Sequence, residues 1–293
     1  MLLERSDQAE TLISSLTAVL DCSQGRTVLV RGEAGIGKTA LLNEFCASLD
    51  GSARVLRAAC DPLFTPQPLG PLFDLAASAG GDLATSVHGS ARPHNVAHAL
   101  LRHLGSHGNA VLVIDDVHWA DEATLDVIRL LGRRIMSVPA LMVLSYRDEQ
   151  LDRSHPLQVV LGDLPGGGQV TRIALGGLSH GAVATLAEPH GIDAAELHER
   201  TAGNPFFVTE VLAAGADRIP HTVRDAVLAR AARLSGRARD LLDAAAVVPW
   251  RAETWLLEAL IPDAITSGLD ECLGSGVLSA ADGWVGHGSD QVD

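Results

Sequence analysis

The chain has 293 residues, of which 47% are hydrophobic and 20% are charged. This apolar share excludes an intrinsically disordered chain, because enough side chains can be buried to offset the entropy of folding. With 22 basic against 36 acidic residues, the formal net charge is −14, which argues against a protein built mainly to bind nucleic-acid backbones. The sequence holds no run of about 18 apolar residues, so it predicts no membrane span.

The cysteines and the first residues of the sequence indicate in which cellular compartment the protein is expected. Cys22, Cys46, Cys60 and Cys272 form no CxxC pair and no zinc-binding spacing. Acidic residues within 1–7 stand where a secretory signal would carry a basic head and an apolar run. We therefore expect reduced, structural thiols in a cytoplasmic protein.

The first half of the chain alternates between strand and helix patterns. The predicted elements, in chain order, are a helix at 7–22, a strand at 27–31, a helix at 39–49, a strand at 54–59, helices at 70–79 and 93–105, a strand at 110–114, a helix at 121–136, and strands at 140–145 and 169–175. Prolines between residues 61 and 71 predict a loop there. Strands that alternate with helices predict an α/β fold with a parallel sheet.

Helical spacing predominates after about residue 178. The predicted helices of this half cover 179–190, 193–202, 205–214, 221–234 and 236–248. The remaining residues, 251–293, predict two short helices and then glycine-rich, strand-like pieces. A boundary near 176–180 therefore separates an α/β half from a helical half.

The most informative motif lies between the first predicted strand and the helix after it. It matches G-x-x-x-x-G-K-[ST] at every position. Glycines let the backbone curl so that successive N–H groups face an anion, and the helix start adds the positive end of its dipole. We expect Lys38 to reach the β- and γ-phosphates and the Thr39 hydroxyl to bind Mg²⁺. The predicted nucleotide-binding residues here are Gly32, Glu33, Ala34, Gly35, Ile36, Gly37, Lys38, Thr39 and Ala40.

Two carboxylates follow the strand at 110–114, at the edge of the sheet where ligands of open α/β folds bind. We expect Asp115 to hold the Mg²⁺ shell, directly or through water, and Asp116 to polarise the attacking water. For Asp116 the alternative of a strand-ending turn residue stays open. An aspartate is also shorter than a glutamate, so it reaches the water less well.

Three further residues lie near this edge. Asp121 is placed to cap the helix that follows it. His118 either senses the γ-phosphate or bonds to a loop, and the sequence favours neither. Arg147, at the end of the strand at 140–145, either reads the γ-phosphate or forms a surface salt bridge with Asp148 or Glu149.

Several of these stretches together resemble a known family. The chain resembles the nucleotide-binding module of STAND ATPases, which is an AAA-type module. The matching stretches are the phosphate loop and residues 114–121, 145–149, 201–208 and 220–227. Within that class the chain is most similar to the large ATP-binding LuxR-type, MalT-like transcriptional regulators. The resemblance covers about residues 3–285.

The resemblance implies a P-loop domain over 1–177 with a five-stranded parallel sheet, a helical lid over 178–235, and a truncated winged-helix-like domain over 236–293. It implies binding of ATP and ADP with Mg²⁺, slow hydrolysis that resets a regulatory switch, and self-association in the ATP state. It also implies that Arg5 lies near the nucleotide and that Pro205, in a Gly-Asn-Pro lid motif, packs near the adenine. From the residues alone, the same tripeptide predicts the end of one helix and the start of the next.

The family's sensor and helix-turn-helix regions have no counterpart in this sequence, so we expect no DNA-binding element here. Two alternative functions stay open. One is a non-hydrolysing interaction module, which the atypical residues around 286–291 favour. The other is a P-loop small-molecule kinase, against which the helical second half argues.

Overall fold

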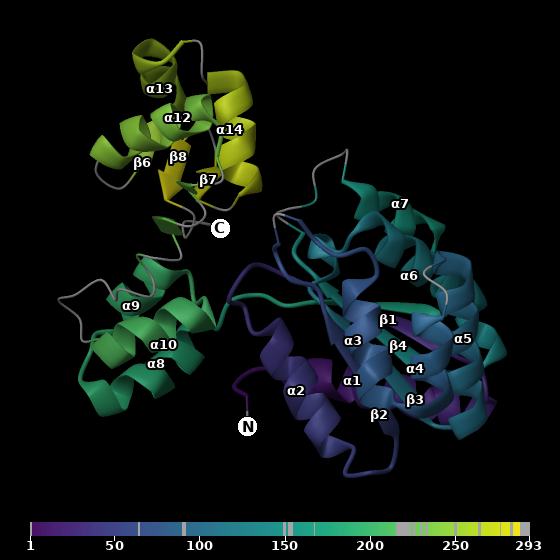
Figure 1. Cartoon of the computed structure of the whole chain (residues 1–293). Coiled ribbons are helices and arrows are strands. Elements are labelled where there is room, and N and C mark those ends of the chain that lie inside the picture. The colour runs from purple at the N-terminus through teal and green to yellow at the C-terminus, as the bar shows by residue number, and fades with distance from the viewer. Residues whose placement is uncertain are drawn as a thin grey trace. The chain divides into compact units, whose positions relative to one another are not determined.

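The computed structural model describes residues 2–63, 65–89, 92–148, 151, 155–166, 168–214, 224, 227–228, 231–232, 234–248, 251–262, 265–275, 277–281 and 284–287. The chain divides into two compact units (Figure 1). The first comprises Met1–Gly32 and Lys38–Leu175, and the second comprises Glu33–Gly37 and Gly176–Asp293. The middle of the predicted phosphate loop is thus grouped with the second unit.

The first unit is built on a five-stranded parallel sheet in the order β2-β3-β4-β1-β5. The strands are β1 Arg26–Arg31, β2 Arg54–Ala59, β3 Ala110–Asp115, β4 Ala140–Tyr146 and β5 Val170–Ala174. Every residue of β3 and β4 is buried, because interior parallel strands are covered on both faces. The predicted α/β fold and the positions of its five strands are confirmed.

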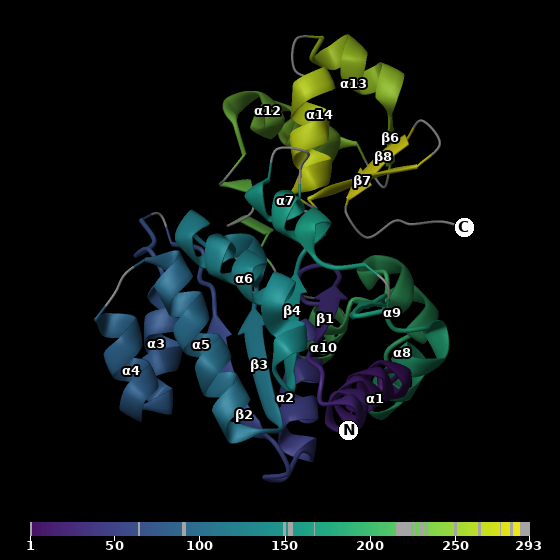
Figure 2. The ribbon, with the colours of Figure 1, turned by 90° about the vertical axis from the view of Figure 1, so that its right-hand side faces the viewer.

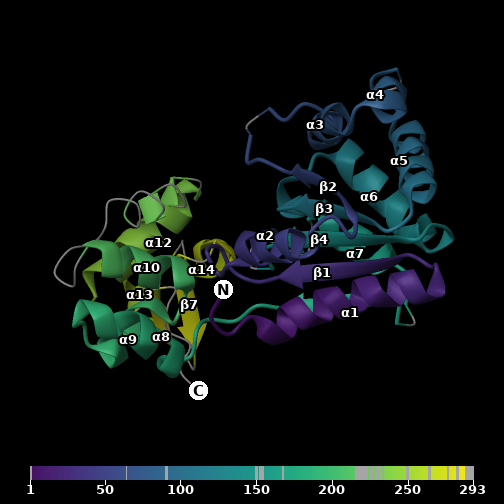
Figure 3. The same ribbon diagram turned by 90° about the horizontal axis from the view of Figure 1, so that it is seen from below.

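Helices cover both faces of this sheet (Figures 2 and 3). The helix α1 Ser6–Cys22 packs along β1 and β4 and also against α2 Lys38–Ser48. The opposite face carries the main hydrophobic core and α3 Gly70–Ala79, α4 Gly81–His88, α5 Pro93–His107, α6 Glu122–Arg134 and α7 Pro156–Asp163. The sequence analysis did not predict α4 and α7.

The second unit contains two groups of elements. One group consists of α8 His180–Ala187, the 3₁₀ helix η3 Glu188–His190, α9 Ala194–Thr201 and α10 Pro205–Ala214. The other consists of α12 Gly236–Val247, α13 Thr254–Leu260 and α14 Ile265–Gly274 with an antiparallel sheet of β6 Arg251–Glu253, β8 Trp284–His287 and β7 Leu278–Ala281. The helix predicted at 221–234 falls largely outside the described residues.

Strand register decides which side chains share the edge of the first sheet. All five strands run in the same direction, so their carboxyl ends meet at one edge. Ile114 of β3 lies beside Leu144 of β4, and Val30 of β1 lies beside Ser145. The register therefore brings the end of β1, Asp115 and Ser145 together. Within the described ranges, no helix is long and apolar enough to span a membrane.

Candidate nucleotide-binding site

The loop between β1 and α2 has the backbone of a phosphate cradle. Gly32, Gly35 and Gly37 have φ angles of 150°, 81° and 100°, which side-chain-bearing residues rarely adopt. The glycine spacing is therefore required by the path of the chain and not only by space. Helix α2 begins at Lys38, directly after the last of these glycines.

Lys38 is the only lysine of the chain, so the other 21 of its 22 basic residues are arginines. Its side chain is buried, and Nζ donates a hydrogen bond of 2.7 Å to the Gly32 carbonyl. The ammonium group is thus folded back over the loop. A compact charge with three rotatable donors fits this curl, whereas a planar guanidinium needs more room.

The Asp115 carboxylate is the centre of the hydrogen bonding at the sheet edge. Oδ2 accepts a bond of 2.8 Å from Thr39 Oγ1, and Oδ1 accepts from the Ser145 hydroxyl. Hydroxyl and carboxylate oxygens are the hard donors that Mg²⁺ prefers, so Thr39 and Asp115 suit that ion. Among the described residues, no group of three or more His, Cys, Asp or Glu side chains could hold a metal. A Mg²⁺ ion bound here would take its remaining ligands from nucleotide phosphates and water.

Ser145 was not predicted as a site residue. It is fully buried in β4, donates to Asp115 and accepts a bond of 2.9 Å from the Asp116 backbone N–H. A single hydroxyl therefore fixes both the carboxylate and the turn after β3. Its signal in the sequence is a polar residue inside the otherwise apolar run at 140–145.

Asp116 sits in a strained turn. Its φ of 53° is left-handed, and it directly precedes the 3₁₀ helix η1 Val117–Trp119. Burial, and then the neighbouring Asp115 charge, raise the pKa of its carboxyl, while Arg147 and Lys38 act in the opposite direction. A non-glycine residue keeps a strained backbone of this kind only where the surrounding structure holds it in place, and such residues are frequent at functional sites.

His118 is buried beside this carboxylate. Its side chain has no exposed surface, and Nδ1 lies 3.8 Å from Asp116 Oδ1. Neither ring nitrogen has a hydrogen-bond partner among the described residues. Burial lowers the pKa of the ring to about 3, and the charges of Arg147 and Lys38 act in the same direction. His118 is therefore a neutral imidazole at neutral pH.

Arg147 follows β4 at the same edge. It acts on the pKa values of both Asp116 and His118, which places its charge within electrostatic reach of that pair. Asp148, one of the salt-bridge partners considered above, pairs instead with Arg31 at 3.4 Å. Glu149, the other one, lies outside the described residues.

Asp121 caps α6, as predicted, since its carboxylate accepts from the Thr124 N–H at 3.0 Å. It also accepts from the Leu69 N–H at 3.2 Å, which ties the proline-rich loop to the start of α6. Leu69 itself is buried with a φ of 62°. The second role could not be predicted, because the two residues are 52 positions apart.

The remaining predicted residues lie at helix starts. Ala40 is in the first turn of α2, and Pro205 is the first residue of α10 in the second unit. Arg5 is buried at the start of α1, where Nη1 donates to the Glu4 carbonyl at 3.1 Å. Arg5 does not belong to the hydrogen-bonded group around Asp115.

The Gly-Asn-Pro tripeptide forms the predicted helix stop and restart. Helix α9 ends at Thr201, Ala202 and Gly203 are left-handed, and α10 starts at once. The Asn204 side chain does more than cap, because Nδ2 donates a bond of 3.0 Å to the Ala34 carbonyl of the phosphate loop. This contact lies within the second unit, which includes Glu33–Gly37.

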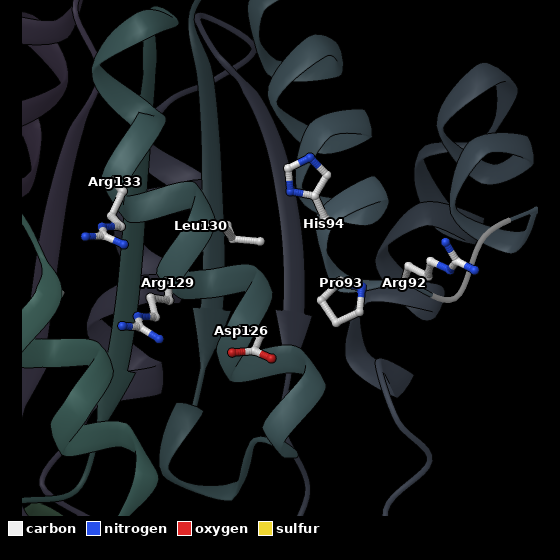
Figure 4. Close-up of a pocket in the computed structure, with 7 residues that line it drawn as sticks. All are labelled: Arg92, Pro93, His94, Asp126, Arg129, Leu130 and Arg133. Carbon is white, nitrogen blue, oxygen red and sulfur yellow. The ribbon is translucent and has the colours of Figure 1, made fainter.

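A separate hollow of about 520 Å³ lies on the surface of the first unit (Figure 4). It contains none of the predicted site residues. One of its arginines, Arg129, is already paired with Asp163. The lining residues are Arg92 and Pro93 at the start of α5, His94, and Asp126, Arg129, Leu130 and Arg133 of α6.

Comparison with known proteins adds the family context. An uncharacterized protein of Rhizobium meliloti (strain 1021) is 27% identical to this chain over 328 aligned residues, covering 89% of this chain and 31% of that protein. The chain thus spans less than a third of the length of this curated relative.

Solved structures with the same fold include the Orc1 protein of Aeropyrum pernix in complex with DNA and Cdc6p from Pyrobaculum aerophilum. Their identities to this chain are 14% and 13%, and both have a TM-score of 0.51. Each match covers 99% of this chain, with 90% of the Orc1 chain and 91% of the Cdc6p chain. At such identities the likeness concerns the fold alone.

The sequence match is more specific than the likeness of fold. Residues 2–144 match the family model for the AAA ATPase domain. That range contains the phosphate loop, Thr39 and Asp115, and it ends one residue before Ser145. The match covers just under half of the chain, and the phosphate loop and the strand order of the first unit agree with it.

Proposed function

We propose that the chain binds ATP and ADP with Mg²⁺ and hydrolyses ATP slowly, so that the bound nucleotide sets the state of the second unit. The observation that carries this proposal is the Asp115 carboxylate, shared between Thr39 and Ser145 at the end of the phosphate loop. The hydrogen bond from Thr39 to Asp115 keeps these two expected Mg²⁺ ligands next to each other. A nucleotide that binds two states with different affinity is sufficient to drive a switch.

In this proposal each residue at the edge has a separate task. Lys38 leaves the Gly32 carbonyl to bind the β- and γ-phosphates, and the loop amides bind phosphate oxygens. Asp116 orients the attacking water, while Arg147 binds the γ-phosphate. A bound Mg²⁺ ion, held by Thr39 and Asp115, would neutralise charge on the phosphates.

Slow turnover is supported by the geometry around Asp116. Its carboxylate is one methylene shorter than that of a glutamate, and its left-handed backbone fixes where the side chain starts. Burial raises the pKa of this carboxyl, which favours the protonated form that cannot accept a proton from water. A base with both properties suits a switch that needs only to be reset.

The wider setting of the chain is proposed on the resemblance. The chain would belong to a transcriptional regulator of the STAND class. Its P-loop domain would cover 1–177, its lid 178–235 and its winged-helix-like domain 236–293. Arg5 and Pro205 would contact the nucleotide, and the ATP form would self-associate. The protein would be cytoplasmic, with no DNA-binding element in this chain.

The test is a titration of the chain with ATP and with ADP in the presence of Mg²⁺, with phosphate release followed in the same samples. We expect both nucleotides to bind, with turnover of a few per minute or less, far below the enzyme median of about 10 s⁻¹. Because Lys38 is the only lysine, an amine-reactive reagent reports on it and the amino terminus alone, and ADP should protect Lys38.

Lys38→Ala is expected to abolish ATP binding. Lys38→Arg keeps the positive charge, so it is the control for the loss of that charge in Lys38→Ala. Unchanged affinity in Lys38→Ala would contradict the assignment of the loop. Binding by the parent chain without any phosphate release would favour a non-hydrolysing module instead.

A further inference from the structure

We propose that Asn204 is a positioning residue for the phosphate loop, which it holds from the side opposite the anion. The side chain is buried, and Nδ2 donates to the Ala34 carbonyl at 3.0 Å. The backbone N–H of Phe206 donates to the next carbonyl of the loop, that of Gly35, at 3.3 Å. The start of α10 thus holds two consecutive peptide groups of the loop.

Peptide geometry gives these bonds a consequence for phosphate binding. In a trans peptide, the carbonyl of one residue and the N–H of the next point in opposite directions, and the described chain has no cis peptide. A donor that fixes the Ala34 carbonyl therefore turns the Gly35 N–H away from Asn204. Successive N–H groups held on one side form the concave surface that binds an anion.

The space around Gly35 shows how close this contact is. A Cβ atom built there would lie 2.7 Å from Phe206 Cβ and 3.0 Å from Asn204 Oδ1. By contrast, a Cβ atom on Gly37 would meet nothing within 4 Å. The loop is therefore packed against the α9–α10 junction at Gly35 and open at Gly37.

The junction itself is held firmly in place. The Leu178 N–H donates to the Gly203 carbonyl at 2.7 Å, and His198 Nε2 lies 3.0 Å from the Leu178 carbonyl. A Cβ atom on Gly203 would lie 2.1 Å from the same Leu178 carbonyl. A fixed junction can hold the loop, whereas a mobile one could not.

This inference rests on the proposed nucleotide binding, and it adds that the loop and the α9–α10 junction respond to phosphate as one body. The test uses the full chain with Asn204→Ser. The Phe206 N–H is shared with Asn204 Oδ1, which accepts from it at 3.1 Å. A serine at this position can still accept this bond as a helix cap, but it is too short to reach Ala34. Asn204→Asp is a second variant, which keeps the shape and replaces the donor by an acceptor.

Two measurements separate positioning from folding. The first is amide hydrogen exchange in the nucleotide-free chain of two N–H groups, that of Phe206, which donates to the Gly35 carbonyl, and that of Ile36, which donates to the Glu33 carbonyl within the loop at 3.4 Å. We expect both to exchange about tenfold faster in Asn204→Ser. The second compares the Kd for ADP with that for adenosine. We expect the ADP value to rise about tenfold, with the adenosine value unchanged, because adenosine has no phosphate for the loop to bind.

The matched control is Asp193→Ala, which removes the cap of α9 without touching the loop. Equal effects of Asn204→Ser and Asp193→Ala, or an equal loss of ADP and adenosine affinity, would overturn the positioning role. Unchanged exchange in both Asn204 variants would overturn it too. If the parent chain bound no nucleotide, the proposed function would fail, while the exchange experiment would still decide whether Asn204 holds the loop.

Discussion

Replacement of His118 by phenylalanine should make the first unit less sensitive to acid. The ring is buried, both of its nitrogens lack hydrogen-bond partners among the described residues, and the pKa is lowered to about 3. Phenylalanine keeps a flat ring of similar size and removes the group that takes up a proton. The variant therefore isolates the cost of a histidine held neutral.

The magnitude follows from linkage between proton binding and folding. In the unfolded chain the pKa of His118 returns to about 6.5, so between about pH 3 and pH 6.5 the unfolded state binds one more proton than the native state. The free energy of unfolding then rises with pH across this window and falls as the pH drops. At about 1.4 kcal/mol per pH unit, the loss from pH 6.5 to pH 5 is about 2 kcal/mol.

The assay is urea unfolding at pH 7.5 and pH 5, followed by the fluorescence of Trp119. That residue is the only tryptophan of the first unit, so replacing the other three by phenylalanine makes the signal specific. We expect the parent to lose about 2 kcal/mol more than His118→Phe between the two pH values. His94→Phe, which removes an exposed ring on α5, is the control. An equal loss in parent and His118→Phe would refute the argument that burial keeps this ring neutral.

Three further predictions concern the sheet edge. Ser145→Ala should lower the free energy of unfolding by about 1.5–3 kcal/mol, because a buried donor to a carboxylate is lost. The control Ser137→Ala, at an exposed position, should change this free energy by no more than about 0.5 kcal/mol. Equal changes of the two variants in urea titrations would contradict the prediction. Asp115→Ala should lower hydrolysis and its Mg²⁺ dependence more than ADP binding, and a phosphate-release assay with turnover equal to that of the parent would exclude this role. Arg147→Ala should reduce the ratio of ADP Kd to ATP Kd, and an unaltered ratio in calorimetry would exclude contact with the γ-phosphate.

The part of the site that follows from local chemistry could be predicted from the sequence. The glycine spacing specifies the loop backbone, and the apolar run before Asp115 specifies a buried strand that ends at the ligand edge. Both features need only neighbouring residues. The structure places Lys38, Thr39 and Asp115 at this edge because the strand order sets β4 between β1 and β3.

Contacts that depend on register or on distant segments could not be predicted. Ser145 meets Asp115 only because Ile114 pairs with Leu144, and a shift of one residue would turn the hydroxyl to the other face. Asn204 lies 170 positions from Ala34, so periodicity carries no information about their hydrogen bond. For His118 the sequence left two alternatives, a γ-phosphate sensor and a hydrogen bond to a loop, and it could not show that the ring is buried, which lowers its pKa.

The two inner glycines of the loop show why its motif has a fixed spacing. Gly35 and Gly37 both need glycine for their positive φ angles, yet only Gly35 is packed against side chains. The open space at Gly37 precedes the start of α2, where an anion is favoured by free N–H groups and the helix dipole. The filled space at Gly35 belongs to the Asn204–Phe206 contact. The loop Glu33–Gly37 therefore has a packed side at Gly35 and an open side at Gly37.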